Sequence, residues 1–108
     1  MDANQLRGNL DTLILAALVD SPAHGYHVIG RIRDRSTGVF DLAEGTVYPA
    51  LHRLEAAGHL RSRWEEIEGR RRKIYSVTPR GRRRLADDRT RWNTFSSVMT
   101  LAIGGETA

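Results

Sequence analysis

Hydrophobic residues recur at helical spacing in two stretches near the start of the chain. Over about residues 10–19 nearly every position is apolar, which predicts a helix that is buried on most sides. In a small chain, such a helix is covered by its own domain and, as one option, by a second subunit. Another helix is expected over roughly residues 25–35, and its inner side should hold Tyr26, Ile29 and Ile32 or Arg33.

A third helical stretch is expected over residues 45–58 and has two different sides. Val47, Leu51 and Leu54 are spaced i, i+4 and i+7, so they share one apolar side. Pro49 indicates that the helix begins near Gly45 or Thr46, because the first turn of a helix tolerates proline. Gly58 favours the end of the helix. By itself, the pattern fits either a DNA-reading helix or an ordinary surface helix. The hydrogen-bonding side chains outside the apolar side are Thr46, Tyr48, His52 and Arg53.

After Gly58, side chains alternate between the two sides of the chain with a period of two residues, which predicts a strand. A turn is expected over residues 68–71, and a second strand over residues 72–77. Together they predict a hairpin with a short, basic, glycine-containing tip. The residues that alternate along the first strand are Leu60, Ser62, Trp64 and Glu66.

A threonine followed by a proline at residues 78–79 is a helix-start signal, and two glycines at residues 104–105 are a stop signal. The last helix is therefore expected from Pro79 to about Ile103. Its side chains form two rows with a spacing of seven, which is close to a coiled-coil repeat. One row holds Leu85, Trp92 and Met99, and the other holds Asp88, Phe95 and Ala102, in which only Asp88 breaks the apolar pattern.

The outer half of this last helix has little left in the domain to pack against. Self-association is the simplest way to cover its apolar side chains. We therefore expect a dimer or effector interface that includes Leu13, Trp92, Phe95 and Met99. A tryptophan on an amphipathic helix is more often plain interface core than part of a ligand pocket, so both interpretations stay open.

Composition adds a charge asymmetry to this pattern. With 108 residues, 40% hydrophobic and 6% aromatic, the chain suits one compact domain with a modest aliphatic core. The formal net charge is +4, but residues 1–60 hold 5 basic and 7 acidic side chains, whereas residues 61–91 hold 12 basic and 5 acidic ones. Positive charge concentrated in this way favours a polyanion partner such as nucleic acid.

Several functional classes are excluded or disfavoured. The chain has no cysteine, which excludes disulfides, thiolate metal sites and cysteine redox sensing. No apolar run approaches a membrane span and no secretion signal is found, so a cytoplasmic protein is expected. His24 and His27 are three residues apart, but no acidic or cysteine partner is near, so we expect neither a metal nor a cofactor. Without a phosphate loop, a nucleophile elbow or a metal-hydrolase motif, an enzyme is not expected.

Three helices, a basic hairpin and a long amphipathic helix, in this order, predict a mainly α winged helix-turn-helix fold with a small β-hairpin. We assign residues 1–78 to a DNA-binding domain and residues 79–108 to a C-terminal dimerisation helix. The third helix would enter the major groove, where Thr46, His52 and Arg53 are expected to reach DNA. Tyr48 either contacts a phosphate or braces the fold. The hairpin, or wing, would present four basic residues near its tip to phosphates or a minor groove: Arg70, Arg71, Arg72 and Lys73.

The chain resembles the PadR family of transcriptional regulators from about Leu6 to the final helix. The most specific motif is the Gly-Thr-x-Tyr-Pro run with its downstream leucines, which is hard to reach by chance. The single final helix is similar to that of the shorter members of the family. The segments that carry the resemblance are residues 6–15, 24–26, 45–55 with Gly58, 69–75 and 78–81.

This resemblance implies a homodimer in which the last helix packs on the first helix of the partner. It also implies a repressor that binds a near-palindromic operator and is released by a small aromatic or lipophilic effector, with Trp92 placed where such a ligand binds in some short members. A nonspecific or architectural nucleic-acid-binding protein remains an alternative, because the same basic wing would serve it. A protein-interaction module using only the last helix is a third option, which the positive segment disfavours.

Overall fold

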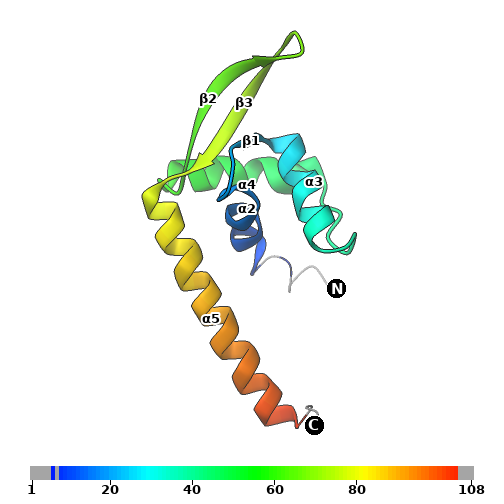
Figure 1. Cartoon of the computed structure of the whole chain (residues 1–108), viewed down its shortest axis with the longest axis vertical. Coiled ribbons are helices and arrows are strands. Elements are labelled where there is room, and N and C mark those ends of the chain that lie inside the picture. Colours follow the sequence, from blue (N-terminus) through cyan, green and yellow to red (C-terminus); the bar gives the residue numbers. More distant parts are fainter. Residues whose placement is uncertain (1–5, 7, 105–108) are drawn as a thin grey trace.

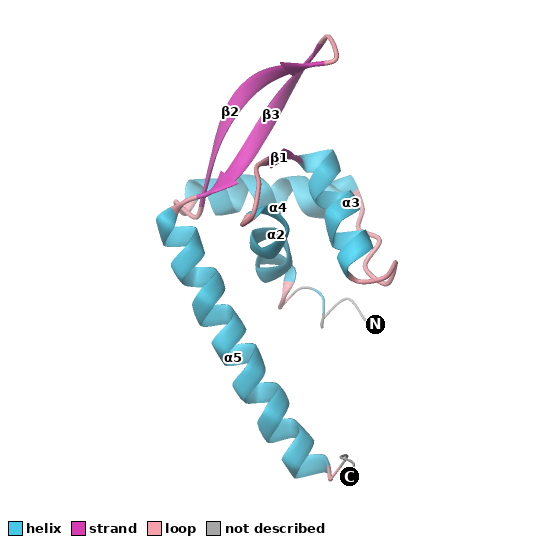
Figure 2. Ribbon diagram, in the orientation of Figure 1, coloured by secondary structure: helices cyan, strands magenta, loops and turns pink. Residues whose placement is uncertain are grey.

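The computed structural model describes residue 6 and residues 8–104. Its elements follow one another as three helices, two long strands and a final helix, with one short strand before the second helix (Figures 1 and 2). The fold is a mainly helical winged helix-turn-helix with a three-stranded antiparallel sheet, as predicted apart from the short strand. The elements are α2 (Leu10–Leu18), β1 (Ala23–His24), α3 (Gly25–Arg35), α4 (Glu44–Ala56), β2 (Leu60–Ile67), β3 (Arg70–Val77) and α5 (Pro79–Ile103).

The core lies between α2, α3 and α4, and the base of the sheet and the first turns of α5 close it. Ile14 and Leu15 of α2 have no exposed surface, in agreement with the expected burial of that helix. On α3 the prediction for Tyr26 was wrong, because its side chain is 63% exposed. Ile29 and Ile32 lie on the inner side as predicted, together with Val28, whereas Arg33 is exposed. At 100° per residue Tyr26 lies about 110° from the centre of that side.

The wing, β2 and β3, is longer than its sequence pattern indicated. The two strands pair antiparallel from Leu60 opposite Val77 to Ile67 opposite Arg70. Only Glu68 and Gly69 form the turn, and both have positive φ angles, 52° and 77°, which is the geometry of a two-residue hairpin turn that matches strand twist. The expected turn over residues 68–71 was therefore too long, and the basic residues that follow Gly69 belong to the strand.

β1 adds a short third strand to the other edge of β3. Ala23 lies opposite Tyr75, and His24 lies opposite Ile74. Two residues are too few to show an alternating pattern, so this strand has no periodic signal in the sequence. Its pairing connects the start of α3 to the middle of the wing.

The bounds of α5 agree with the predicted start and stop signals. The Thr78 hydroxyl accepts a hydrogen bond from the Gly81 N–H at 3.0 Å, and Gly104 adopts the left-handed conformation with φ of 72°. A side chain at Gly81 would place its Cβ 2.1 Å from the His59 carbonyl oxygen, so glycine permits the close approach of α5 to the end of α4.

Asp88 is an anchor within α5, not a simple interruption of its apolar row. It is buried, and its carboxylate accepts a hydrogen bond from the Thr12 hydroxyl at 2.8 Å and pairs with Arg84 and Arg91. Leu85 packs in the core one turn earlier. From Arg91 to Gly104 every residue is exposed, and α5 projects away from the body (Figure 1).

Candidate nucleic-acid interface

α4 has the two sides that its sequence predicted. Val47, Leu51 and Leu54 are fully or almost fully buried, and Ala50 joins them. The outward side is exposed and carries Thr46, Pro49, His52 and Arg53. A helix fixed through one side and open on the other can enter a major groove without disturbing the core.

Tyr48 braces α4 against α3. Its ring is half-buried and packs on the backbone of Gly25, where an added Cβ would lie 2.5 Å from the Tyr48 Cε1 atom. Burial, together with the nearby Glu44 carboxylate, raises the pKa of the Tyr48 hydroxyl, while Arg72 opposes the rise. The side chain is thus a neutral hydrogen-bonding group near the start of α3 and the wing.

Arg53 lies on the flank of α4 that faces α2. Its guanidinium is 2.6 Å from the Asp11 carboxylate, which also accepts a hydrogen bond from Arg84 at 3.1 Å. The Arg53 side chain is still 58% exposed. An exposed ion pair of this kind contributes roughly 0–1 kcal/mol to folding, so a DNA phosphate or base can compete for the guanidinium at little cost.

The opposite flank of α4 is tied to the wing through Glu55. The Glu55 carboxylate accepts a hydrogen bond from the Ser62 hydroxyl at 2.5 Å and pairs with the Lys73 ammonium at 3.2 Å. The Ser62 hydrogen bond is the main reason that the pKa of Glu55 is lowered, and the bond to Glu55 is the main reason that the pKa of Lys73 is raised. The orientation of the wing relative to α4 is thereby fixed from one side.

The four basic residues predicted for the wing do not form a single cluster. Successive side chains of a strand point to opposite faces, and directly paired residues share a face. Arg71 and Lys73 lie on the face that carries Trp64, and the Arg71 guanidinium stacks 4.8 Å from the centre of the Trp64 ring. Arg70 and Arg72 lie on the other face, so the wing is basic on both sides.

Two exposed aromatic side chains extend this surface beyond the residues that were predicted. Trp64 is 56% exposed on the wing, and Tyr26 is exposed at the start of α3. The alternating pattern identified the strand that carries Trp64 but gave no sign that a large aromatic ring would be left uncovered. Both rings are suited to contact sugar or base edges, because they combine an apolar face with a polar tip.

His24 and His27 form a stacked pair at the start of α3, with ring centres 4.1 Å apart. The His24 Nδ1 atom accepts a hydrogen bond from the His27 N–H at 3.4 Å, so it caps the helix. Burial lowers the pKa of His24, and the charges of His27, Arg72 and Arg31 lower it further, which keeps the ring in the neutral form needed to accept. Within the described residues, no three His, Asp or Glu side chains are arranged to hold a metal ion.

The side chains predicted for a dimer or effector interface lie mainly on the outer part of α5. Trp92 and Phe95 are more than half exposed, with ring centres 6.3 Å apart, and Met99 is also exposed. Leu13 is half-buried on α2, against the core. A hollow of about 350 Å³ lies between the two helices, lined by Thr12, Asp88, Arg91, Trp92 and Phe95 with Gly8 and Asn9.

The positive charge of residues 61–91 is divided between two elements. The wing strands and their turn carry six basic and three acidic side chains, whereas α5 carries six basic and two acidic ones. The charge asymmetry seen in the sequence therefore belongs to α5 as much as to the wing. In the part of the chain that the structure describes, no helix combines the length and the apolar character required to cross a membrane.

Comparison with known proteins connects this arrangement to a group of regulators. A profile described as the Transcriptional regulator PadR-like family matches residues 14–87, which include α3, α4 and the wing. The chain is 40% identical over 93 residues to the Transcriptional regulator Rv3488 of Mycobacterium tuberculosis, covering 86% of this chain and 81% of that protein.

Solved structures give the same result. A transcriptional regulator from Clostridium thermocellum is 30% identical, with a TM-score of 0.83, and the match covers 91% of this chain and 96% of that one. A PadR family transcription regulator from Clostridium difficile is 32% identical, with a TM-score of 0.80, and covers 89% and 99% of the two chains.

Proposed function

Because the chain belongs to the PadR-like family of transcriptional regulators, we propose that it acts as a homodimeric repressor that a small aromatic or lipophilic effector releases from its operator. Family membership makes it a DNA-binding regulator and not an enzyme. The observation that supports sequence-specific DNA binding is the geometry of α4, which is buried through one side, open on the other and flanked by a basic wing. Its place of action would be the cytoplasm.

α4 is the reading element in this proposal. Its exposed side would lie in the major groove, with Thr46, His52 and Arg53 directed at the DNA. Tyr48 would hold α4 at the correct angle to α3 and the wing. The wing bases Arg70, Arg71, Arg72 and Lys73 would neutralise flanking phosphates, which supply affinity without sequence choice.

The outer part of α5 is the dimerisation surface in this proposal. Its exposed apolar side chains, which include Trp92, Phe95, Val98 and Met99, follow one another along the helix. A second copy of the chain, related by a two-fold axis, would cover these side chains with the same surface of its own α5. The assignment of residues 79–108 to dimerisation is part of this proposal, although Leu85 and Asp88 also anchor α5 to the first helix.

The hollow beside Trp92 and Phe95 is the proposed effector site. Two aromatic rings give an apolar surface against which a flat ligand packs, and the same rings lie in the proposed dimer surface. A ligand there would alter the relation between the two subunits and hence the spacing of their reading helices. Aromatic compounds should quench Trp92 fluorescence in a Trp64→Phe variant, where Trp92 is the remaining tryptophan.

The test of the proposed function is selection of bound fragments from the organism's own genomic DNA in the presence of excess random DNA. We expect a near-palindromic site whose half-sites lie about one helical turn apart, roughly 34–36 Å. Release of that site should then be screened with small aromatic compounds. Equal affinity for random DNA would favour the architectural alternative, and no DNA affinity would favour the interaction module.

A further inference from the structure

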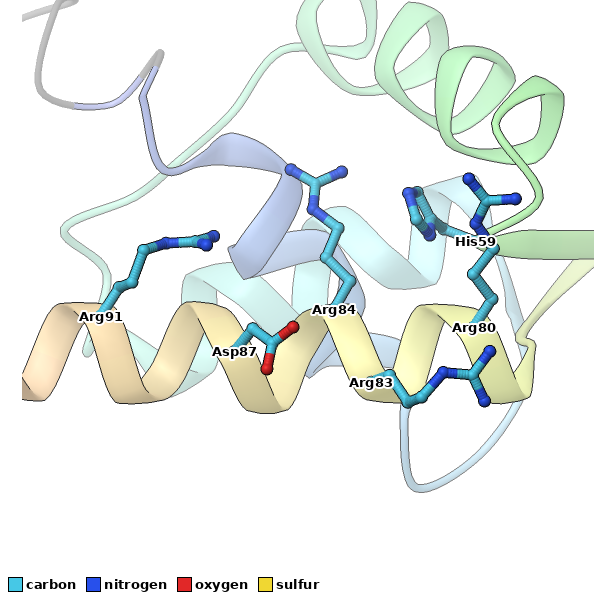
Figure 3. A pocket seen from close by; sticks show the side chains of 6 residues that line it. All are labelled: His59, Arg80, Arg83, Arg84, Asp87 and Arg91. Atoms are coloured by element: carbon cyan, nitrogen blue, oxygen red, sulfur yellow. The ribbon is translucent and has the colours of Figure 1, made fainter.

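A second basic surface lies at the junction of α4, β2 and α5, outside the proposed reading helix and wing. It is an open groove of about 600 Å³ along the first half of α5. In Figure 3, Arg80, Arg84 and Arg91 rise from α5 toward the side where His59 lies, between α4 and β2, whereas Arg83 and Asp87 lie across the near face of the helix. The lining residues are His59, Arg80, Arg83, Arg84, Asp87 and Arg91.

The position of these arginines on α5 is electrostatically unusual. The first turn of α5 contains no acidic residue, and Arg80, Arg82, Arg83 and Arg84 lie at the positive end of the helix dipole. Negative side chains are favoured at that end and positive ones are disfavoured. Residues that break a local rule without a compensating contact often mark a functional surface.

Internal ion pairs neutralise only part of this charge. Arg84 pairs with Asp11 and Asp88, and Arg91 pairs with Asp88. Arg80 and Arg83 make no ion pair or hydrogen bond with any residue that the structure describes. Two guanidinium groups are therefore available in the groove, and their planar donor pattern matches the oxygens of a phosphate.

His59 lines the same groove and is only partly exposed. Its Nδ1 atom is buried and has no hydrogen-bond partner among the described residues. Burial lowers the pKa of the His59 ring, and the charges of Arg84 and Arg80 lower it further, while Asp11 and Asp88 oppose them. The backbone N–H groups of Gly81 and Arg82 are already bonded to the Thr78 hydroxyl and carbonyl oxygens, so the site is assigned to the side chains.

We propose that this groove is a second anion site, in which Arg80 and Arg83 bind phosphate groups beside His59. The phosphates have two potential sources, the DNA backbone next to the operator or a free phosphorylated small molecule. The DNA source rests on the proposed function, whereas the free ligand does not. α5 and the wing leave the end of α4 in opposite directions (Figure 1), so the groove supplies contacts that the wing does not make.

A pair of charge-matched double variants tests the groove. Arg80→Gln with Arg83→Gln removes the two available guanidinium groups. Arg82→Gln with Arg89→Gln removes the same charge from exposed positions of the same helix that do not line the groove. Circular dichroism and thermal unfolding should be the same for the two variants, because none of the four residues makes an ion pair within the described structure.

In the DNA arm, binding to a random-sequence duplex is measured against salt concentration. Two lost phosphate contacts should flatten the slope of log K against log salt by about 2 units and weaken binding roughly 10- to 100-fold at 0.1 M salt. The control pair should lose much less. In the second arm, inorganic triphosphate is titrated into DNA-free protein by calorimetry, and binding that is lost only in the groove variant identifies a free phosphorylated ligand.

If the groove variant alone loses affinity for the duplex or for triphosphate, the result supports the proposed anion site. The arm in which the loss occurs identifies the source of the phosphate groups. Equal behaviour of the two double variants in both arms would overturn the proposal. A wild-type chain that binds no duplex would refute the proposed function, but the triphosphate arm would still decide whether the groove binds phosphate. A variant with Arg70→Gln and Arg72→Gln on the wing separates the two surfaces, since it should weaken DNA binding without changing triphosphate binding.

Discussion

The exposed tryptophan on α5 gives a quantitative test of the proposed dimer. Trp92 is 55% exposed in the single chain. A tryptophan side chain has on the order of 200 Å² to bury, so complete covering by a second copy would remove about 110 Å² per protomer from water. At about 25 cal/mol per Å², this contributes roughly 3 kcal/mol per protomer and 6 kcal/mol per dimer.

Trp92→Ala should therefore weaken dimerisation strongly. The full estimate corresponds to about four powers of ten in the dissociation constant, and covering only half of the exposed ring still gives about 100-fold. Sedimentation equilibrium over a range of protein concentrations would measure the change. The folded monomer should keep its helical content, because the exposed ring lies outside the core.

Trp64→Ala is the matched control, since Trp64 is 56% exposed but lies on the wing. It removes a side chain of the same size and exposure, and it should leave the dissociation constant within a few-fold of the wild type. If the two substitutions change dimerisation equally, or if Trp92→Ala leaves the dimer intact at the same concentrations, the outer part of α5 is not the interface.

Three further predictions concern DNA binding, packing and pH. Arg53→Ala should reduce discrimination between operator and random DNA, whereas Arg71→Ala should weaken both and flatten the salt slope by about one unit in filter-binding assays. Gly81→Ala should destabilise the chain by about 1–3 kcal/mol or more in urea unfolding, because its Cβ would meet the His59 carbonyl oxygen at 2.1 Å. The pKa values of His24 and His59 are lowered by burial, so unfolding takes up protons in acid. Their contribution to stability is complete above about pH 6.5 and is lost as the pH falls from there toward the lowered pKa values, which urea midpoints at several pH values would show.

Each of these three predictions has its own control. If Arg53→Ala and Arg71→Ala reduce the affinity for operator DNA and for random DNA to the same extent, α4 and the wing do not have the separate roles that we propose. Gly45→Ala should be neutral or slightly stabilising, since nothing lies within 4 Å of the added Cβ and α4 is helical there. Substituting both histidines with glutamine should flatten the acid slope of stability, and an unchanged slope would assign it to other groups.

The bounds of α5 could be predicted to the residue from local sequence signals. A threonine cap, a proline in the first position and a glycine after the last turn all act through the backbone of neighbouring residues, so no distant contact was needed to read them. The apolar side of α4 could be predicted equally well. Apolar residues repeated every three to four positions identify the buried side of a helix, whichever element packs against it. The four predicted bases of the wing, by contrast, are divided between its two faces, and this division required the true length of the turn.

The sequence by itself determined the winged-helix order, the helix α4 with its buried side, the basic hairpin and the limits of the long helix. Only the tertiary structure decided that Asp88 is anchored by Thr12, that Arg53 pairs with Asp11 and that Tyr48 packs on Gly25. The first two contacts join residues 76 and 42 positions apart. Helical and strand periods describe one element at a time, whereas the partner of a charged or aromatic side chain depends on how separate elements pack. For the same reason, the sequence showed an excess of arginine on the last helix, but only the fold showed that Arg84 and Arg91 are ion-paired.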